Sequence, residues 1–206
     1  METEKRTRTN DDLLGKMWKT KSARFNAHLR LRRKHNLSTW ATSILAFYIF
    51  AASLIPLVYT SLASGGAERL ISVLTVIISV FLIIITLLEG SKRYDSEADR
   101  MLNCGLEISE IYNRFQALNK EKADERRTEF NNEYSAVMNR YGLNHEDVDF
   151  LKFKMANRAE LRTDWSQFLF DSVKYLVLWI GEYWLYIVLV VIPPLTAVLL
   201  RRQLGF

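Results

Sequence analysis

The sequence has very few of the residues that build disulfides and metal sites. It has one cysteine among 206 residues, Cys104, which excludes a disulfide within the chain and any site that needs several cysteines. Its three histidines, His28, His35 and His145, are scattered, so a zinc site has little to draw on. We therefore expect neither a metal nor another cofactor.

Catalytic signatures are also missing from the sequence. It contains no P-loop, no G-x-G-x-x-G, no G-x-S-x-G and no H-E-x-x-H. Acidic residues are numerous between residues 95 and 149, but Lys and Arg alternate with them, as on a solvated helix. Cys104 lies on an apolar seam, where a small core residue is a more common role than a nucleophile. We predict that the protein is not an enzyme. Activity on lipid is also not expected, because the sequence offers no nucleophile or metal set.

Positive charge is concentrated at the N-terminal end. The net charge is +5, but residues 1–37 hold eleven Lys or Arg against four Asp or Glu, so the rest of the chain is slightly acidic. Four cations, Arg30, Arg32, Arg33 and Lys34, stand just before a long uncharged run. Near anionic headgroups each cation contributes about 1 kcal/mol. We predict that this basic collar holds the start of a membrane span, and contact with nucleic acid through the same cations stays open.

Two runs long enough to cross a membrane carry no charge. Residues 40–62 contain 23 uncharged residues, which span about 34 Å as a helix, and residues 70–88 contain 19. A short turn at 63–67 separates them, which predicts a transmembrane hairpin within residues 37–90. Lys and Arg flank the outer ends of both runs, and Arg69 alone lies between them. By the positive-inside rule, both ends of the hairpin face the cytoplasm.

Hydroxyl residues recur at helical spacing on both runs. They are Thr42, Ser53 and Thr60 on the first, and Ser72, Thr75, Ser79 and Thr86 on the second. Hydroxyl and small residues let helices approach closely in lipid. These faces therefore either pack the hairpin or, in a homo-oligomer, line a pore. No ring of charge accompanies them, so such a pore would select poorly among ions.

Residues 91–174 are charged and predict a cytoplasmic helical hairpin or coiled coil. Its apolar residues recur at spacings of three and four, which indicates a seam for a second copy or a partner. The seam comprises Ile108, Ile111, Phe115, Leu118, Tyr134, Val137 and Tyr141. Between its two halves, residues 119–129 predict a turn or an exposed stretch. Gly142 is expected to end one helix and Asn144 to cap the next.

The N-terminal arm, residues 1–36, predicts a basic amphipathic helix. Residues 1–10 are polar and expected to be disordered. From Leu13 to His35, apolar and basic residues share one helical face, which suits a membrane surface or an acidic partner.

The C-terminal segment, residues 175–206, is strongly apolar. Its uncharged run from Tyr183 to Leu200 is just long enough for a third span. Pro193 and Pro194 either kink that span or turn the chain back, and we favour a single span. Glu89 and Glu182 stand at the edges of apolar runs. Such acids are functional candidates, although both can reach the headgroup layer. The fold class is thus an all-α membrane protein.

Two segments resemble the SLATT domains, the SMODS and SLOG-associating two-transmembrane effector domains. They are RFNAHLRLRRK at 24–34 and EYSAVMNRYGLNHEDVDFLKFK at 133–154, and the likeness extends over roughly residues 12–160. The resemblance implies a toxic effector of bacterial anti-phage defence. Such effectors are thought to oligomerise and to permeabilise or depolarise the inner membrane, which causes growth arrest or cell death in abortive infection.

The resemblance also implies a cytoplasmic sensor as partner. The sensor would be a cyclase-linked nucleotide second-messenger module or a reverse transcriptase with its RNA–DNA product, as in retrons. The helical domain at 91–174 would take the signal. The alternative is a non-toxic membrane scaffold that recruits a cytoplasmic partner through the same domain.

Overall fold

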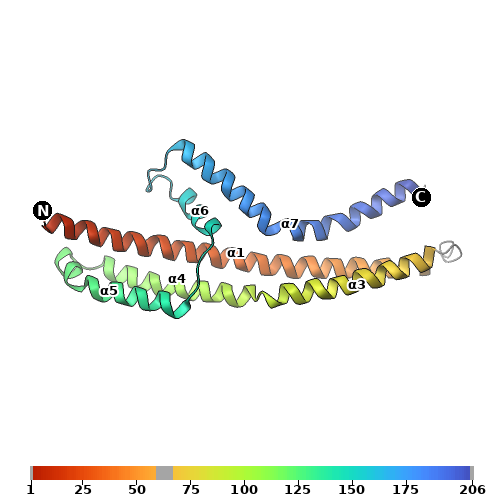
Figure 1. Ribbon diagram of the computed structural model, residues 1–206, viewed down its shortest axis with the longest axis horizontal. Coiled ribbons are helices and arrows are strands. Elements are labelled where there is room, and N and C mark those ends of the chain that lie inside the picture. Colours follow the sequence, from red (N-terminus) through yellow and green to blue (C-terminus); the bar gives the residue numbers. More distant parts are fainter. Residues whose placement is uncertain (1, 59–66, 205–206) are drawn as a thin grey trace. The chain divides into compact units, whose positions relative to one another are not determined.

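The structure is a computed structural model that describes the backbone of residues 2–58 and 67–204. Its helices are α1 (Glu2–Val58), α3 (Ala67–Ser91), α4 (Tyr94–Gln116), α5 (Lys120–Tyr141), α6 (Asp147–Ala156) and α7 (Trp165–Leu204) (Figure 1). No strand occurs in these two described ranges. The predicted all-α fold is therefore confirmed. Thr60 and residues 63–66 of the predicted turn lie outside the described residues.

The helix α1 is unbroken over 57 residues. The prediction of a disordered start at residues 1–10 is wrong, because the helix already includes Glu2. The Glu, Lys and Arg residues of this segment are good helix formers, and adding turns to an existing helix is favourable. No proline precedes Pro56, so nothing in the sequence forces a break between the basic arm and the first apolar run.

The chain divides into two compact units. The first, here called the bundle unit, takes in α1 up to Arg32 and residues Tyr94–Trp179. The second, here called the membrane unit, takes in Arg33–Arg93 and α7 from Ile180 onward, and it carries the apolar runs. Both α1 and α7 contribute turns to each unit.

In the bundle unit, α4 and α5 form an antiparallel pair beside the first half of α1 (Figure 1). The buried core joins all three helices and contains Leu13, Met17, Cys104, Ile108, Ile111, Phe115, Ala123, Phe130, Tyr134 and Val137. The turn between α4 and α5 falls at residues 117–119. The Asn119 side chain accepts the Lys122 N–H at 3.1 Å and so caps α5. Gly142, with a φ of 57°, ends α5 as predicted.

The short helix α6 lies against α1 in the same unit. Its N-terminus is a capping box, in which the side chains of Glu146 and Asp149 each accept the backbone N–H of the other residue. The prediction that Asn144 caps this helix is therefore wrong. The ring of Phe153 meets Trp18 of α1 edge-on, with 4.8 Å between ring centroids.

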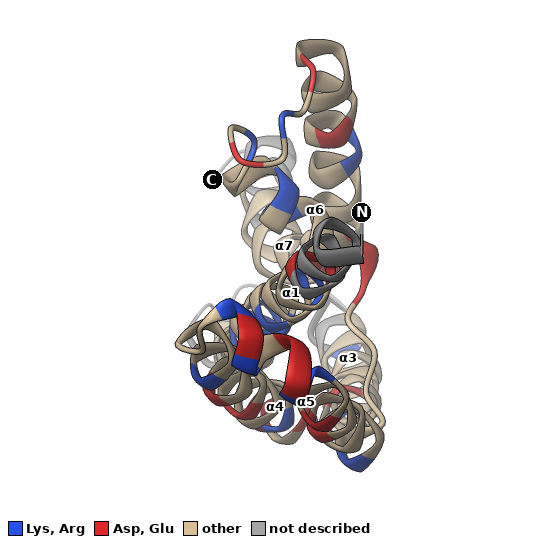
Figure 2. Cartoon of the chain, turned by 90° about the vertical axis from the view of Figure 1, so that its left-hand side faces the viewer, with Lys and Arg blue, Asp and Glu red and all other residues tan. Residues whose placement is uncertain are grey.

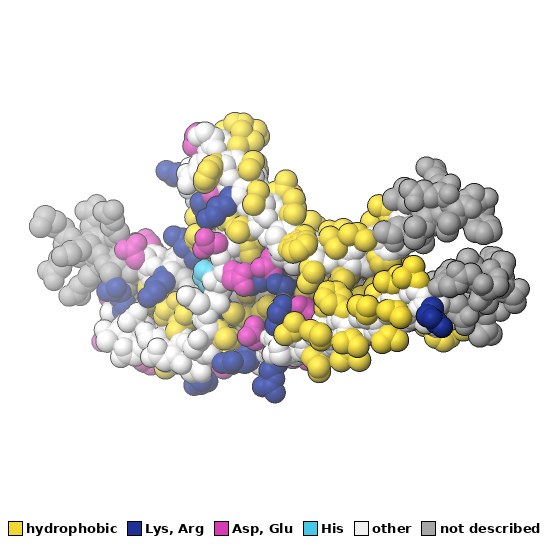
Figure 3. Space-filling model, turned by 45° about the vertical axis from the view of Figure 1, so that its right-hand side comes forward, with side chains coloured by type: hydrophobic (Ala, Val, Ile, Leu, Met, Phe, Trp, Pro, Cys, Tyr) yellow, Lys and Arg dark blue, Asp and Glu magenta, His cyan; other side chains and the backbone are white. Residues whose placement is uncertain are grey.

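In the membrane unit, α1, α3 and α7 share a small core made of Ala41, Leu45, Ile85, Tyr183, Tyr186 and Leu189. Most other large apolar side chains of these segments are exposed, and hydrophobic side chains gather over them in Figure 3. Within the part of the chain that the structure describes, three helical stretches are long and apolar enough to cross a membrane. Helix α7 continues through Pro193 and Pro194, which favours the single span over a re-entrant turn.

Candidate functional site

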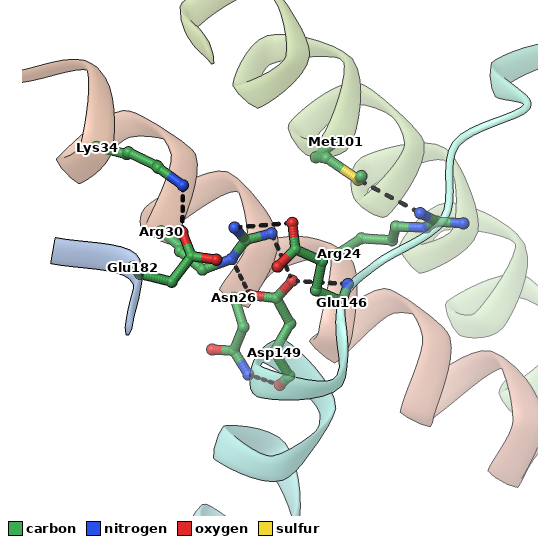
Figure 4. Close-up of polar contacts among 8 residues, drawn as sticks. All are labelled: Arg24, Asn26, Arg30, Lys34, Met101, Glu146, Asp149 and Glu182. Atoms are coloured by element: carbon green, nitrogen blue, oxygen red, sulfur yellow. Dashed lines mark hydrogen bonds and ion pairs between the residues drawn. The ribbon is translucent and has the colours of Figure 1, made fainter. Parts of the chain in front are cut away.

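The first cation of the basic collar lies inside the bundle unit. Arg30 is 9% exposed, and its guanidinium donates to both carboxylate oxygens of Asp149, at 3.0 and 3.2 Å (Figure 4). A third nitrogen lies 3.2 Å from a Glu146 carboxylate oxygen. Two parallel bonds between charged groups fix geometry as well as supplying energy. Arg30 therefore fastens the N-terminus of α6 to α1.

Asn26 adds a neutral contact to the same junction. Its side-chain amide donates to the backbone carbonyl of Asp149 at 3.1 Å (Figure 4). Asp149 thus receives α1 donors on both its carboxylate and its carbonyl, and it is almost fully buried. We call Asn26, Arg30, Glu146 and Asp149 the α6 clamp.

Six residues before Arg30 on α1, Arg24 is buried, and it has no acidic partner among the described residues. Its guanidinium donates to the Met101 sulfur at 3.3 Å and to the Leu143 carbonyl, while its Nε atom has no hydrogen-bond partner among the described residues. Burial raises the pKa of the Cys104 thiol, and Arg24 offsets part of that rise. Cys104 is fully buried in the core, so we infer that it acts there as a neutral, unreactive side chain.

The remaining collar residues divide between exposure and pairing. Arg32 and Arg33 are exposed, so their predicted contact with lipid or nucleic acid stays a prediction. Lys34 forms an ion pair with Glu182 of α7 inside the membrane unit (Figure 4). Arg30 and Lys34 therefore already have partners within the chain, and the exposed part of the collar is smaller than its sequence indicates.

Glu89 lies in a second polar cluster of the membrane unit. It is buried and accepts the Tyr186 hydroxyl at 2.5 Å, and the Lys92 ammonium lies 2.6 Å from its other oxygen. Together with the Lys34–Glu182 pair, these contacts pair both Glu89 and Glu182 with a cation and connect α1, α3 and α7. We call these five residues the polar layer. The sequence marked both acids but could not show that they point between helices.

A cavity of about 470 Å³ lies among the same three helices, lined by Leu45, Tyr48, Ile49, Ala51, Ala52, Ile55, Thr75, Ile78, Pro193 and Pro194. Pro194 has no N–H to give to the carbonyl of Val190, four residues earlier. The Tyr48 hydroxyl lies 3.5 Å from that carbonyl oxygen and partly replaces the missing donor.

The predicted pore-facing hydroxyls are mostly satisfied within their own helices. Thr42, Ser53, Ser79 and Thr86 each donate to a carbonyl three or four residues earlier. Thr42, Thr75 and Ser79 are half-buried, whereas Ser53, Ser72 and Thr86 are exposed. These hydroxyls can therefore face lipid in one chain at modest cost. Whether they line a pore stays a prediction.

The predicted seam lies largely in the interior of the chain. Five of its members, Ile108, Ile111, Phe115, Tyr134 and Val137, are buried in the three-helix core, while Leu118 and Tyr141 pack against it half-buried. The outer faces of α4 and α5 carry charges of both signs, visible in Figure 2. Tyr141 donates to Glu107 at 2.7 Å, and this bond raises the pKa of Tyr141. A partner that binds this unit would therefore contact the charged outer faces of α4 and α5, because the seam is largely buried.

No group of three or more His, Cys, Asp or Glu that could hold a metal ion occurs among the residues that the structure describes. The polar groups found are paired ions and hydrogen bonds between helices. Such contacts hold helices together when they are formed, and the helices can separate when they are broken. We therefore regard the α6 clamp and the polar layer as the candidate functional sites.

The fold is that of an all-helical, membrane-type domain that joins a charged helical bundle to apolar spans. The chain belongs to the SMODS and SLOG-associating 2TM effector domain family 5, whose model matches residues 7–200. This confirms the resemblance and makes the protein an effector domain of a family associated with defence systems. The match takes in most of α7, so the third apolar helix belongs to the family region. No curated protein and no solved structure matches the chain.

Proposed function

We propose that the protein is an effector that permeabilises the bacterial inner membrane when a cytoplasmic sensor acts on its bundle unit. The observation that carries this proposal is the unbroken helix α1, Glu2–Val58, which contributes to the bundle core and to the membrane unit alike. Because α1 is continuous, a change in its packing within the bundle unit could be transmitted along the helix to the first span. Family membership supports the effector role.

The membrane step would be assembly of several copies. In one chain, the acids of the polar layer are paired with cations, and four of the hydroxyls donate to carbonyls of their own helices. In a homo-oligomer, the exposed hydroxyls of α1 and α3 would face one another and admit water between the helices. The pore would carry no charged ring and would depolarise the membrane without strong ion selectivity.

The orientation follows from charge. Arg32, Arg33, Lys92 and Arg93 are exposed and flank the inner ends of the spans, whereas Arg69 is the one cation between the first two spans. The bundle unit would therefore face the cytoplasm, where a nucleotide second-messenger module or a reverse transcriptase with its RNA–DNA product could reach it. Within the basic collar, Arg32 and Arg33 are the exposed cations and would make the phosphate contact, whether with lipid or with nucleic acid.

The test is leakage through a defined membrane. Full-length protein is reconstituted in vesicles of phosphatidylethanolamine and phosphatidylglycerol that hold a fluorophore, and expressed in bacteria that carry a potential-sensitive dye. The Arg30→Ala variant, which breaks the α6 clamp, is used to mimic activation in the absence of the sensor. We expect Arg30→Ala to increase leakage over the wild type.

Matched variants test the hydroxyl face. Ser72→Ala with Thr86→Val should reduce leakage of the Arg30→Ala protein, whereas Ile77→Val with Leu87→Ile, which change lipid-facing side chains of the same helix, should not. If inserted wild-type and Arg30→Ala proteins leave both vesicles and membrane potential unchanged, the proposal fails. The chain would then fit a scaffold that recruits its partner through the charged faces of α4 and α5.

A further inference from the structure

The first turns of α7 carry an apolar face that the described residues of the bundle unit leave largely exposed. Between Trp165 and Trp179, large apolar side chains recur at spacings of three and four. Six of them are half or more exposed: Trp165, Leu169, Phe170, Val173, Leu176 and Val177. Phe170, the most exposed, is 69% accessible. We call these six residues the α7 stripe.

Ion pairs fix which way the stripe faces. On the opposite side of the helix, Asp171 pairs with Lys154 at 2.7 Å, and Lys174 pairs with Asp147 at 3.1 Å. Both partners belong to α6. Because these contacts hold the polar side of α7 toward α6, the stripe points away from the rest of its own unit. Burial of the stripe would therefore require a surface from outside the bundle unit.

The stripe is not needed for crossing the membrane. The uncharged run from Tyr183 to Leu200 measures about 27 Å as a helix, close to the hydrocarbon thickness of about 30 Å. Residues 165–179 precede that run, and they include Asp171 and Lys174, which do not suit the hydrocarbon layer. A segment that is apolar on one side and charged on the other suits the interface between lipid and water.

We propose that residues 165–179 form a membrane-surface helix whose stripe inserts among the lipids of the leaflet from which α7 starts its span. Residues 165–179 end three residues before Glu182, and Trp165 lies about 27 Å along the helix from Tyr183, where the apolar run starts. A span that enters at a tilt brings these turns against the headgroups.

Composition favours lipid over protein as the cover. Trp165 and Trp179, at the two ends of the segment, are typical of the interface. The Arg158 guanidinium lies 4.5 Å from the Trp165 ring centroid and 4.8 Å from that of Phe168, which puts a cation beside the stripe for anionic headgroups. This inference requires only membrane insertion and does not rest on pore formation.

Photo-crosslinking identifies the cover directly. Benzoylphenylalanine replaces Phe170 or Val173 in the stripe, or Gln167 as a control, which is exposed on the polar side of the same helix. Full-length variants in phosphatidylethanolamine–phosphatidylglycerol vesicles, and in intact cells, are irradiated and their masses measured. We expect lipid adducts at residues 170 and 173 at least fivefold above those at residue 167.

Other products would overturn the proposal. A crosslinked homodimer at both stripe positions would assign the stripe to a second copy, and a crosslink to another protein in cells would assign it to a partner. Equal lipid adducts at all three positions, or none, would also refute a surface helix. A Val173→Glu variant should lower the adducts at residue 170, while Val173→Leu should keep them. Leakage is read separately, so failure here leaves the proposed function standing.

Discussion

Arg30 and Asp149 share two hydrogen bonds, at 3.0 and 3.2 Å, although 119 residues separate them in the chain. Both side chains are buried. The pair joins the helix that becomes the first span to α6, and α6 in turn pairs with the first turns of α7 through Lys154 and Asp171. The bundle unit thus connects parts of α1 and α7 through α6 by ion pairs, whereas its apolar core is built from α1, α4 and α5.

The first prediction concerns this buried pair. Arg30→Ala leaves the Asp149 carboxylate without its main counter-charge, a change that typically costs about 3–5 kcal/mol. We expect α6 to detach locally, so its amides should lose protection in hydrogen–deuterium exchange while those of α4 and α5 keep theirs. Arg33→Ala, at an exposed cation, should leave the protection of α6 unchanged.

A paired substitution separates charge from packing. Arg30→Met with Asp149→Leu removes both charges together, and buried ion pairs replaced by apolar residues are often neutral or stabilising. Protection of α6 should then recover in part relative to Arg30→Ala, because the variant still lacks the Asp149 oxygen that accepts the Glu146 N–H. If Arg30→Ala leaves α6 protection unchanged, the pair does not hold that helix.

The second prediction concerns Gly105 in the bundle core. A Cβ added there would lie 2.9 Å from the Phe25 ring of α1, closer than side chains tolerate. Gly105→Ala should therefore lower stability by about 1–3 kcal/mol as the ring is displaced. Gly15→Ala is the control, because its added Cβ meets nothing within 4 Å. It should stabilise α1 by about 0.5–1 kcal/mol. Thermal unfolding in detergent measures both, and equal shifts would contradict the close contact.

Local patterns in the sequence were sufficient to predict the helices but not their partners. The spacing of Ile108, Ile111 and Phe115 predicted a buried seam, yet could not tell that α1 of the same chain covers it. Likewise, the sequence cannot distinguish a cation that faces lipid headgroups from one that pairs with a glutamate on another helix. Lys34 is of the second kind, because it pairs with Glu182. Pairing across more than a hundred residues leaves no periodic signal in one sequence.

The third prediction compares two tyrosines of the membrane unit. Tyr186 donates to the Glu89 carboxylate at 2.5 Å, whereas the Tyr48 hydroxyl lies 3.5 Å from the Val190 carbonyl oxygen. Bonds to charged groups are the strong ones and long bonds are weak. Tyr186→Phe should therefore cost about 1–3 kcal/mol in detergent-induced unfolding. Tyr48→Phe should cost less than about 0.5 kcal/mol. Equal losses would show that the polar layer is not selectively stabilising.

The last prediction concerns Asp164, which caps α7. Its carboxylate accepts the Ser166 hydroxyl at 2.6 Å and the Ser166 N–H at 3.3 Å, and the hydroxyl bond is the main reason that its pKa is lowered. Because the folded-state pKa lies below the unfolded value, the cap contributes fully above the ordinary aspartate pKa of about 3.9. That contribution is lost as the pH falls through the lowered pKa. The Ser166 amide signal in NMR should therefore shift below about pH 4. Asp164→Asn keeps an acceptor that does not titrate, so a similar shift in that variant would refute the assignment.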